Sequence, residues 1–414
     1  MRGSGRWGLG LRLAVGVVVA LTSAACDGGD GADEAAPRPA GKPVRIGFVN
    51  LEGAPVGSIP ELRIGAEVAV DYLNAERGGL GGRPIDLEVC ITNGSPEASA
   101  ACANQMVERG VVAVVGGVDL GSSASLPILA AAGIPYLGAT PLLPADFTTD
   151  GAFTLDPGGL GVAASAAFAV DELAAKRVAV LHDDSAQGRQ LAEVFVRPVL
   201  LDRGLEPSQV ELIAEKADAP DVAPALAAAT RSTPDAVIVV FPPPHCSRVM
   251  QAASTLGVKA AMFYIGRCAG PRAVEAGGAG ADGAYFFSSI LNVDAHADHP
   301  DVRLYRSKVD EFGGSDVDAG SYDTARGFAT TMTFYERLST LEGEDITPST
   351  VTEAFRAAVG APAFMGHPYT CDGRQAVPGF VSLCNAHVRI YQLVDGRYRD
   401  ASGDWISAAA ALPG

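Results

Sequence analysis

Several features are scarce in this 414-residue chain, and each scarcity excludes a class of protein. Aromatic residues make up only 7% of the sequence, which is too few for a nucleic-acid platform built from stacked rings. The 31 basic side chains are outnumbered by 48 acidic ones, so neither nucleic acid nor an anionic membrane surface is expected as the main partner. Charged residues reach only 19%, which is low for a disordered chain. The length favours a soluble protein of two or three domains.

Motifs that bind cofactors, bind metals or carry out catalysis are missing as well. The chain contains no P-loop, no H-E-x-x-H and no G-x-S-x-G motif, and its cysteines and six histidines do not have zinc-site spacing. A G-x-G-x-x-G match at 278–283 lies between a predicted helix and a predicted strand, which is the wrong order for a dinucleotide site. We therefore expect no catalytic residue, no metal and no cofactor. A secreted α/β hydrolase is the weaker alternative. It gains support only if a histidine and a nucleophile converge in a cleft, and His245 opposite Ser122 or Ser123 is the pair to check.

The apolar run at residues 13–21 has nine residues and is too short to span a bilayer, which takes about 20 residues. It follows three arginines and precedes small residues and Cys26, an arrangement that resembles a bacterial lipobox, although Ser23 stands where leucine is usual. We expect a signal peptide at 1–25, lipidation of Cys26 and a flexible tether at 26–43. An ordinary signal peptide that leaves Cys26 as a free thiol is the alternative. Cleavage leaves 28 basic against 48 acidic side chains, a formal charge of −20.

Six cysteines remain after Cys26, an even number in a chain predicted to be exported, where disulfides persist. Sequence alone permits several connectivities, and the alternative is that some of these cysteines are buried thiols. We expect local pairing. The three expected bridges are Cys90–Cys102, Cys246–Cys268 and Cys371–Cys384.

Strand and helix patterns alternate along the chain. A β-rich segment at 44–51 precedes a helix that begins at Pro60, and a near-continuous apolar strand at 111–118 is typical of parallel sheets buried on both faces. The alternation restarts after residue 157 and predicts two doubly wound α/β lobes. If the late helices return to the first lobe, the chain crosses three times between lobes. The expected boundaries are 44–157 plus about 290–361 for one lobe, and about 158–289 plus about 362–414 for the other.

Two loops at the carboxyl ends of predicted strands form a candidate anion site. The first carries Ser122 and Ser123 at the start of a helix, where hydroxyls and free backbone amides bind anions. The second carries Gly138, Ala139 and Thr140 after the following strand. Open α/β sheets bind ligands beyond the carboxyl ends of their strands, so we expect a small carboxylate here. The alternative is that Ser123 only caps its helix.

The segments V-R-I-G-F, G-A-E-V-A-V-D-Y-L-N-A-E-R-G-G-L-G-G-R-P-I (65–85), G-S-S-A-S and G-I-P-Y-L-G-A-T resemble those of a known family. The family comprises the extracytoplasmic solute-binding proteins of the Leu/Ile/Val-binding type, with the type I periplasmic binding protein fold. The resemblance covers residues 44 to about 400. It implies two Rossmann-like lobes on a three-strand hinge, a Venus flytrap that closes on a ligand and passes it to an ABC permease and its ATPase. We also expect a monomer, tethered by lipid to the outer face of the cytoplasmic membrane.

The resemblance places a second-lobe loop at 180–188, which makes Ser185 and Gln187 candidate ligand residues. Here Gln187 replaces an aromatic residue that many members of the family have. Arg267 stands where binders of α-amino acids place a carboxylate, and His245 ends a segment that often supplies a tyrosine. An ammonium group buried without a charge partner costs several kcal/mol, so a free amino acid is a less secure expectation. Arg267 is a candidate to meet a second carboxylate or a polar head group, or else is an exposed surface arginine.

These observations favour a binding protein over an enzyme. The expected function is the solute receptor of an ABC importer, for a small amino-acid-like or carboxylate-bearing ligand. The alternative is a sensory module of similar fold that reports its ligand to a partner receptor without transport.

Overall fold

The computed structural model describes residues 38–53, 57–138, 140–216, 219–241, 243–341, 345–374 and 377–413. The expected signal peptide, Cys26 and most of the expected tether lie outside these residues. Among the helices that are described, none is both long and apolar enough to cross a membrane.

The first half of the chain builds a five-stranded parallel sheet with the strand order β2-β1-β3-β4-β5. Its strands are β1 (Val44–Leu51), β2 (Ile85–Thr92), β3 (Val114–Val115), β4 (Tyr136–Gly138) and β5 (Ala152–Thr154). Strand β3 is shorter than the predicted strand at 111–118. Its regular part ends at Gly116 and Gly117, where the side chain of Asn50 lies so close that a Cβ on Gly117 would meet its Oδ1 atom at 2.2 Å. The Asn50 Oδ1 atom then accepts the amide of Val118 at 3.1 Å in place of a ladder hydrogen bond.

Seven helices of the described residues belong with this sheet, and three of them come from much later in the chain. The early ones are α1 (Pro60–Glu76), α2 (Pro96–Arg109), α3 (Ser122–Ala131) and α4 (Pro144–Thr148), and the late ones are α11 (Pro300–Phe312), α12 (Tyr322–Leu338) and α13 (Pro348–Arg356). Phe328 of α12 and Phe355 of α13 are buried in one hydrophobic cluster with Val44 and Ile46 of β1. We call the five-stranded sheet with these seven helices lobe 1.

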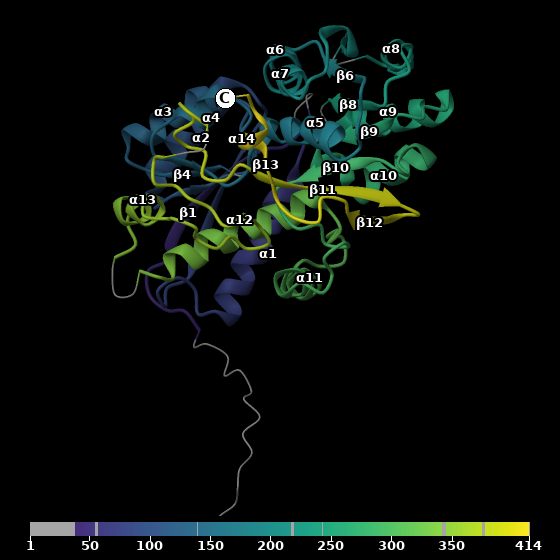
Figure 1. Ribbon diagram of the computed structural model, residues 1–414. Helices are drawn as coiled ribbons and strands as arrows, with labels where there is room; N and C mark the ends of the chain where they lie inside the picture. The colour runs from purple at the N-terminus through teal and green to yellow at the C-terminus, as the bar shows by residue number, and fades with distance from the viewer. Residues whose placement is uncertain are drawn as a thin grey trace, which may run out of the picture. The chain divides into compact units, whose positions relative to one another are not determined.

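Helices α1 and α12 lie side by side (Figure 1). Glycine permits this approach, because a Cβ on Gly65 would meet the carbonyl oxygen of Thr324 at 2.0 Å. A Cβ on Gly327 would likewise meet the carbonyl oxygen of Leu62 at 1.9 Å. The helix that carries part of the candidate site, α12, is therefore held against the backbone of α1 with no room for a larger residue.

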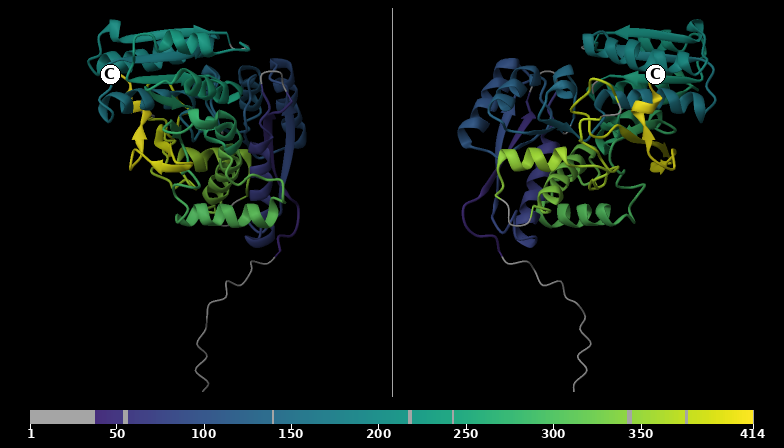
Figure 2. Two further views of the ribbon diagram at one scale, coloured as in Figure 1. Left: turned by 90° about the vertical axis from the view of Figure 1, so that its right-hand side faces the viewer. Right: turned by 60° about the vertical axis from the view of Figure 1, so that its left-hand side comes forward.

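An eight-stranded sheet follows, with the order β12-β11-β10-β9-β8-β6-β7 and with β13 paired to β11. Its strands are β6 (Val178–Asp183), β7 (Val210–Glu215), β8 (Ala236–Val240), β9 (Ala261–Tyr264), β10 (Tyr285–Ser288), β11 (His387–Val394), β12 (Arg397–Asp400) and β13 (Ile406–Ser407). Strands β6 to β10 are parallel, and β11 adds antiparallel to β10. Figure 2 shows the hairpin of β11 and β12 in yellow. Asp395 and Gly396 turn it with positive φ angles of 51° and 72°, as is typical of an Asp-Gly hairpin turn.

The helices of this sheet are mostly short. They are η1 (Gly158–Leu160), α5 (Gly161–Asp171), α6 (Ala186–Gln190), η2 (Leu191–Val196), α7 (Arg197–Asp202), η3 (Pro207–Gln209), α8 (Ala223–Ala229), α9 (Pro243–Leu256), η4 (Gly266–Ala269), α10 (Pro271–Gly277), η5 (Gly278–Gly280) and α14 (Ala408–Ala411). We call the eight-stranded sheet with these helices lobe 2. The two α/β lobes with their parallel sheets confirm the predicted fold class.

The chain passes between the two sheets after β5, after β10, and between α13 and β11. The third connection contacts the other two, because Leu383 forms a bridge with Thr154 and Gly366 forms one with Ile290. These paired connections form the hinge between the lobes.

Part of the third connection packs on lobe 1. Tyr369, Cys371 and Cys384 are buried in the same hydrophobic cluster as β1 and α12. Their position favours a last passage to lobe 2 after Cys384, later than the expected boundary near residue 361.

The three predicted disulfides are confirmed. Cys90–Cys102 joins β2 to α2, Cys246–Cys268 joins α9 to η4, and Cys371–Cys384 closes a loop within the third connection. The second bridge matters most for the site, since it ties together two segments that carry candidate ligand residues.

Candidate functional site

A cavity of about 1060 Å³ is lined by loops of both lobes, beyond the carboxyl ends of several parallel strands. This is the position at which open α/β sheets bind ligands. Lobe 1 contributes apolar side chains, namely Leu51, Ile59, Val118, Leu120 and Leu142. Lobe 2 contributes the ionisable side chains Asp183, Asp184, Lys216, His245, Arg248 and Arg267, and also apolar ones such as Leu191, Phe241 and Phe287. Asp156, Tyr322 and Arg326 line the cavity beside the hinge.

Five of the predicted ligand residues line this cavity, and three do not. Those that do are Thr140, Ser185, Gln187, His245 and Arg267. Ser122 and Gly138 are buried away from it, and Ser123 is exposed within α3. Ala139 lies outside the described residues.

The helix start at Ser122 and Ser123 lies outside the cavity lining, and the chain supplies its own anion there. The buried carboxylate of Asp119 accepts the amide of Gly121 at 2.9 Å and the hydroxyl of Ser125 at 2.6 Å. The carboxylate of Asp119 therefore occupies the helix start at which the sequence predicted a bound anion. The alternative that Ser123 caps the helix is wrong, since the N-cap residue is Gly121.

Arg267 is largely buried, so its interpretation as an exposed surface arginine is wrong. Its guanidinium forms an ion pair with Asp323 of α12 at 3.1 Å, and the two side chains are 12% and 17% exposed. This pair links lobe 2 to lobe 1. A second link comes from Gln187, whose Nε2 atom donates to the carbonyl oxygen of Leu142 at 3.1 Å. Both residues therefore hold the lobes together at the cavity wall, and their contact with a ligand stays a prediction.

The predicted second-lobe loop begins helix α6. Ser185 is its N-cap, with its hydroxyl accepting the amide of Gly188 at 3.0 Å, and Asp183 accepts the amide of Ser185 at 2.9 Å. A Cβ at Gly188 would lie 2.4 Å from the carbonyl oxygen of Asp183, so the tight turn requires glycine. In the first turn of α9, the buried ring of His245 stacks on Phe241, with 5.3 Å between ring centroids.

Four polar side chains form a buried network where two of the hinge connections meet α12. Arg326 pairs with Asp156, and its Nη1 atom also donates to the hydroxyls of Tyr322 at 2.7 Å and Ser289 at 2.9 Å. Burial alone would lower the pKa of Arg326, but the charge of Asp156 outweighs it and raises that pKa above its ordinary value. Burial raises the pKa of Tyr322. Sequence patterns offered no signal for this network, since its members come from three separate segments.

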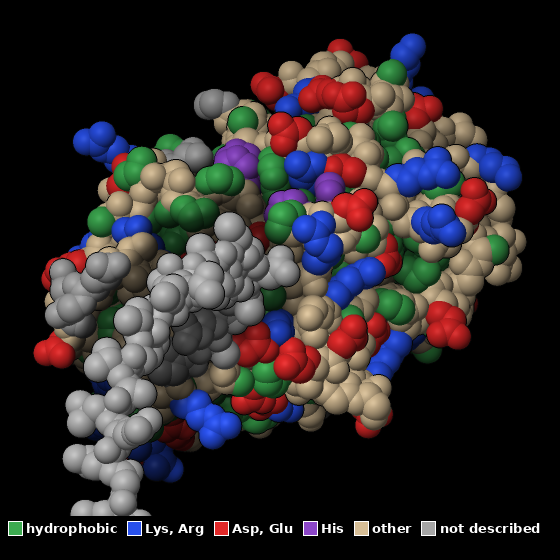
Figure 3. Space-filling view, turned by 90° about the horizontal axis from the view of Figure 1, so that it is seen from below, with side chains coloured by type: hydrophobic (Ala, Val, Ile, Leu, Met, Phe, Trp, Pro, Cys, Tyr) green, Lys and Arg blue, Asp and Glu red, His purple; other side chains and the backbone are tan. Residues whose placement is uncertain are grey.

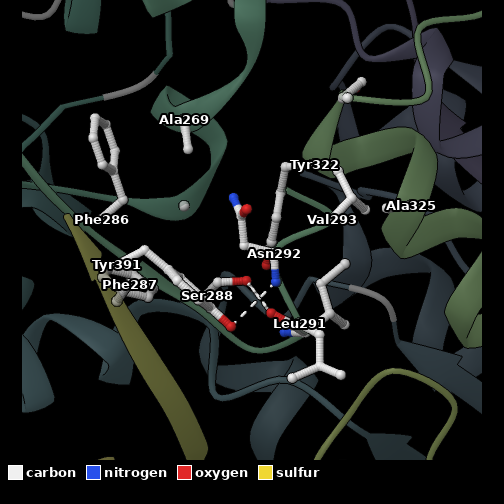
Figure 4. Close-up of a pocket in the computed structure, with 14 residues that line it drawn as sticks. Ala269, Phe286, Phe287, Ser288, Leu291, Asn292, Val293, Tyr322, Ala325 and Tyr391 are labelled. Atoms are coloured by element: carbon white, nitrogen blue, oxygen red, sulfur yellow. Dashed lines mark hydrogen bonds between the residues drawn. The ribbon is translucent and has the colours of Figure 1, made fainter. Parts of the chain in front are cut away.

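A second cavity at the hinge has a volume of about 20 Å³, which suits a single water molecule and excludes a solute (Figure 4). Beside it the hydroxyl of Tyr391 accepts the amide of Asn292 at 3.1 Å, and Ser288 donates to the carbonyl oxygen of Ile290 at 2.6 Å. This space belongs to the packing of the second connection.

Two arrangements in the described residues would point to catalysis or metal binding: the histidine–serine pair of the hydrolase alternative and a group of metal ligands. His245 lines the main cavity whereas Ser122 and Ser123 do not, so the pair required by the hydrolase alternative is not assembled there. Within the described ranges, no group of three or more His, Cys, Asp or Glu side chains is placed to hold a metal ion.

Comparison with known proteins decides the family. The family model described as "Periplasmic binding protein" matches residues 43–387. The chain belongs to the periplasmic binding protein family. A Leu/Ile/Val-binding protein homologue from Brucella melitensis is 30% identical over 158 residues, which cover 37% of this chain and 42% of the relative. The chain thus spans less than half the length of that relative.

Solved structures share the fold of this periplasmic binding protein. A branched-chain amino acid ABC transporter protein from Thermus thermophilus with bound valine has a TM-score of 0.75 and 17% identity, over 89% of this chain and 98% of the other. A solute-binding protein from R. palustris in complex with 4-hydroxybenzoate has a TM-score of 0.72 and 14% identity, over 88% and 97%. The comparisons confirm the predicted type I fold, and they identify the chain as a member of a family of binding proteins.

Proposed function

We propose that this periplasmic binding protein captures a small carboxylate-bearing or amino-acid-like solute between its lobes and delivers it to the permease and ATPase of an ABC importer. The observation that carries the proposal is the cavity of about 1060 Å³, whose wall is shared by both lobes beside a three-connection hinge. A solute that touches both walls stabilises the arrangement with the lobes together, and that arrangement is what a permease recognises. The relatives support the solute class, since one is named for Leu, Ile and Val and two neighbours hold valine and 4-hydroxybenzoate.

We also propose that the protein is a monomer held by a lipid on Cys26 at the outer face of the cytoplasmic membrane. Its acidic body suits this place only through such an anchor, because an anionic lipid surface repels a chain of formal charge −20 after cleavage. On the face shown in Figure 3, acidic and basic side chains of the described residues are interspersed and form no basic stripe. A Cys26→Ser variant should leave the membrane fraction, and light scattering after gel filtration should give the monomer mass.

The binding proposal is tested by a thermal-shift screen of the mature chain against amino acids, small carboxylates, amides and ureas. A ligand at 100 times its dissociation constant adds about 2.7 kcal/mol to the folded state, which the melting temperature reports clearly. Thr140 is the one described residue of the predicted lobe 1 loops that lines the cavity. Thr140→Ala should therefore lower the affinity for the best compound of the screen. If no compound in the screen raises the melting temperature, capture of a small solute is refuted.

Delivery needs a separate assay. The solute-loaded protein should stimulate ATP hydrolysis by the reconstituted permease and ATPase, and the empty protein should stimulate it less. Equal stimulation by loaded protein, empty protein and buffer would contradict delivery and leave capture in place.

A further inference from the structure

Apart from the Asp156–Arg326 ion pair beside the hinge, the part of the cavity wall that lobe 1 forms carries no charge. This uncharged part of the wall comes from the ends of β1, β3 and β4 and from the start of α1. It includes no acidic and no basic residue. Leu51 and Val118 belong to a hydrophobic cluster of lobe 1, against which Ile59, Leu120 and Leu142 pack. The edge of a lobe 1 core cluster thus faces the cavity, and such a surface binds the apolar part of a ligand.

The charged groups of the lobe 2 wall are not equally available to a ligand. Arg267 is paired with Asp323, and the carboxylate of Asp183 already accepts the Ser185 amide at the start of α6. Asp184 is exposed. The remaining charges of this wall belong to two cations, Lys216 and Arg248.

These two cations are the ones whose charge is not balanced by an acid. In the described part of the chain, neither Arg248 nor Lys216 forms an ion pair. Arg248 is half-buried on α9, and its Nη1 atom donates to the carbonyl oxygen of Ala219 at 2.8 Å. That bond fixes one side of a guanidinium that has five N–H donors, so others stay available at the cavity wall. Lys216 lies just beyond β7 and is exposed. A half-buried guanidinium without a carboxylate is a ready partner for an anion.

We propose that the solute is an amphipathic carboxylate whose charged head binds Arg248 and Lys216 of lobe 2 while its apolar body lies against the lobe 1 wall. This inference rests on the proposed capture of a solute in the same cavity. It reverses the arrangement predicted from sequence, which placed the carboxylate on lobe 1. The volume of about 1060 Å³ leaves room for a body larger than a branched-chain amino acid side chain.

The head group is tested with two probes of the same shape, 4-methylpentanoate and the neutral 4-methylpentanamide, by titration calorimetry on the full mature chain. The acid should bind at least about 10-fold more tightly than the amide. Arg248→Gln should weaken the acid by about 10- to 100-fold and leave the amide unchanged. Arg231→Gln is the matched control, because this arginine lies before β8 at the opposite edge of the same sheet and is exposed. Lys216→Gln, at an exposed site that tolerates substitution, should weaken the acid by a smaller factor, so the test survives if Arg248→Gln fails to fold.

The body is tested with straight-chain acids from butanoate to octanoate. Each added methylene should improve affinity by about 4-fold while it stays buried. Leu120→Ser should reduce this gain without changing the preference for acid over amide.

Three results would overturn the proposal. The first is equal affinity for the acid and the amide, and the second is an unchanged affinity for the acid in both Arg248→Gln and Lys216→Gln. The third is no increase in affinity from butanoate to octanoate. Asp184→Asn separates a cationic solute from an anionic one. Weaker binding in this variant, with no effect of Arg248→Gln, would show that an ammonium group is recognised instead. Each of these outcomes leaves capture of a solute intact, whereas an absence of any hit in the thermal-shift screen would refute capture itself.

Discussion

Asp156→Asn is the most informative single change at the hinge. Asp156 lies directly after β5, on the first connection, and its partner Arg326 comes from α12 of lobe 1. The two side chains are only 8% and 4% exposed, so water does not replace the lost partner. The asparagine keeps the shape of the side chain and one acceptor, but it leaves the guanidinium charge buried without a counter-charge.

The expected cost follows from that burial. Removing one partner of a buried ion pair destabilises a protein by about 3–5 kcal/mol, because the remaining charge stays desolvated. The bonds from Arg326 to the hydroxyls of Ser289 and Tyr322 remain, so we expect a loss at the lower end, about 3 kcal/mol. Urea unfolding should show a lower midpoint with an unchanged slope, since the surface exposed on unfolding stays the same.

A double-mutant cycle isolates the pair. Asp156→Asn with Arg326→Met removes both charges, and it should cost less than the sum of the two single changes. If Asp156→Asn costs below about 1 kcal/mol, or if the two costs simply add, the buried pair does not hold the hinge and the reasoning fails.

Three further changes probe other features. Asp323→Asn removes the partner of Arg267 that links the lobes, so solute affinity should fall by about 10-fold as the arrangement with the lobes together becomes less populated. Burial and then the neighbouring His367 lower the pKa of His387 to about 4, so the unfolded chain takes up its proton first as pH falls. Folding stability should therefore drop progressively from pH 6.5 to about 4, by about 1–2 kcal/mol for this half-exposed ring, and His387→Gln should flatten that drop in pH-dependent urea unfolding. Replacing Cys246 and Cys268 by alanine should cost about 3 kcal/mol in the same unfolding assay.

Each of these predictions has a result that contradicts it. Unchanged affinity in Asp323→Asn would mean that the ion pair does not bias the lobes. An equal slope of stability against pH in His387→Gln and the parent would assign the acid sensitivity to other groups. Full stability without the Cys246–Cys268 bridge would mean that packing alone holds η4 against α9.

Much of the fold was predictable because it depends on local patterns. Alternating strand and helix periods identified the two α/β lobes, and short cysteine spacings favoured the three local disulfides. The prediction of strand 111–118 was too long, because its continuous apolar run does not reveal that Asn50 approaches the backbone at Gly117. Hydrophobicity marks a buried segment, but it does not say where the ladder ends.

The candidate site was less predictable, because its members depend on long-range partners. Thr140, Ser185, Gln187, His245 and Arg267 line the cavity, since strand ends and loops indicate position in an α/β fold. The role of Ser122 depended on a neighbour that the motif does not include, the carboxylate of Asp119. No sequence motif indicated that Arg248 lines the cavity.

The sequence by itself indicated most of the elements, the local pairing of the cysteines and the family, because helix and strand periods, short cysteine spacings and motif phrases are properties of neighbouring residues. Only the tertiary structure decided which charges are already paired. Arg267 meets Asp323, and Arg326 meets Asp156 170 residues away. A side chain is open to a ligand only when no group of the folded chain has satisfied it. That condition depends on contacts between distant segments, and a linear sequence does not display them.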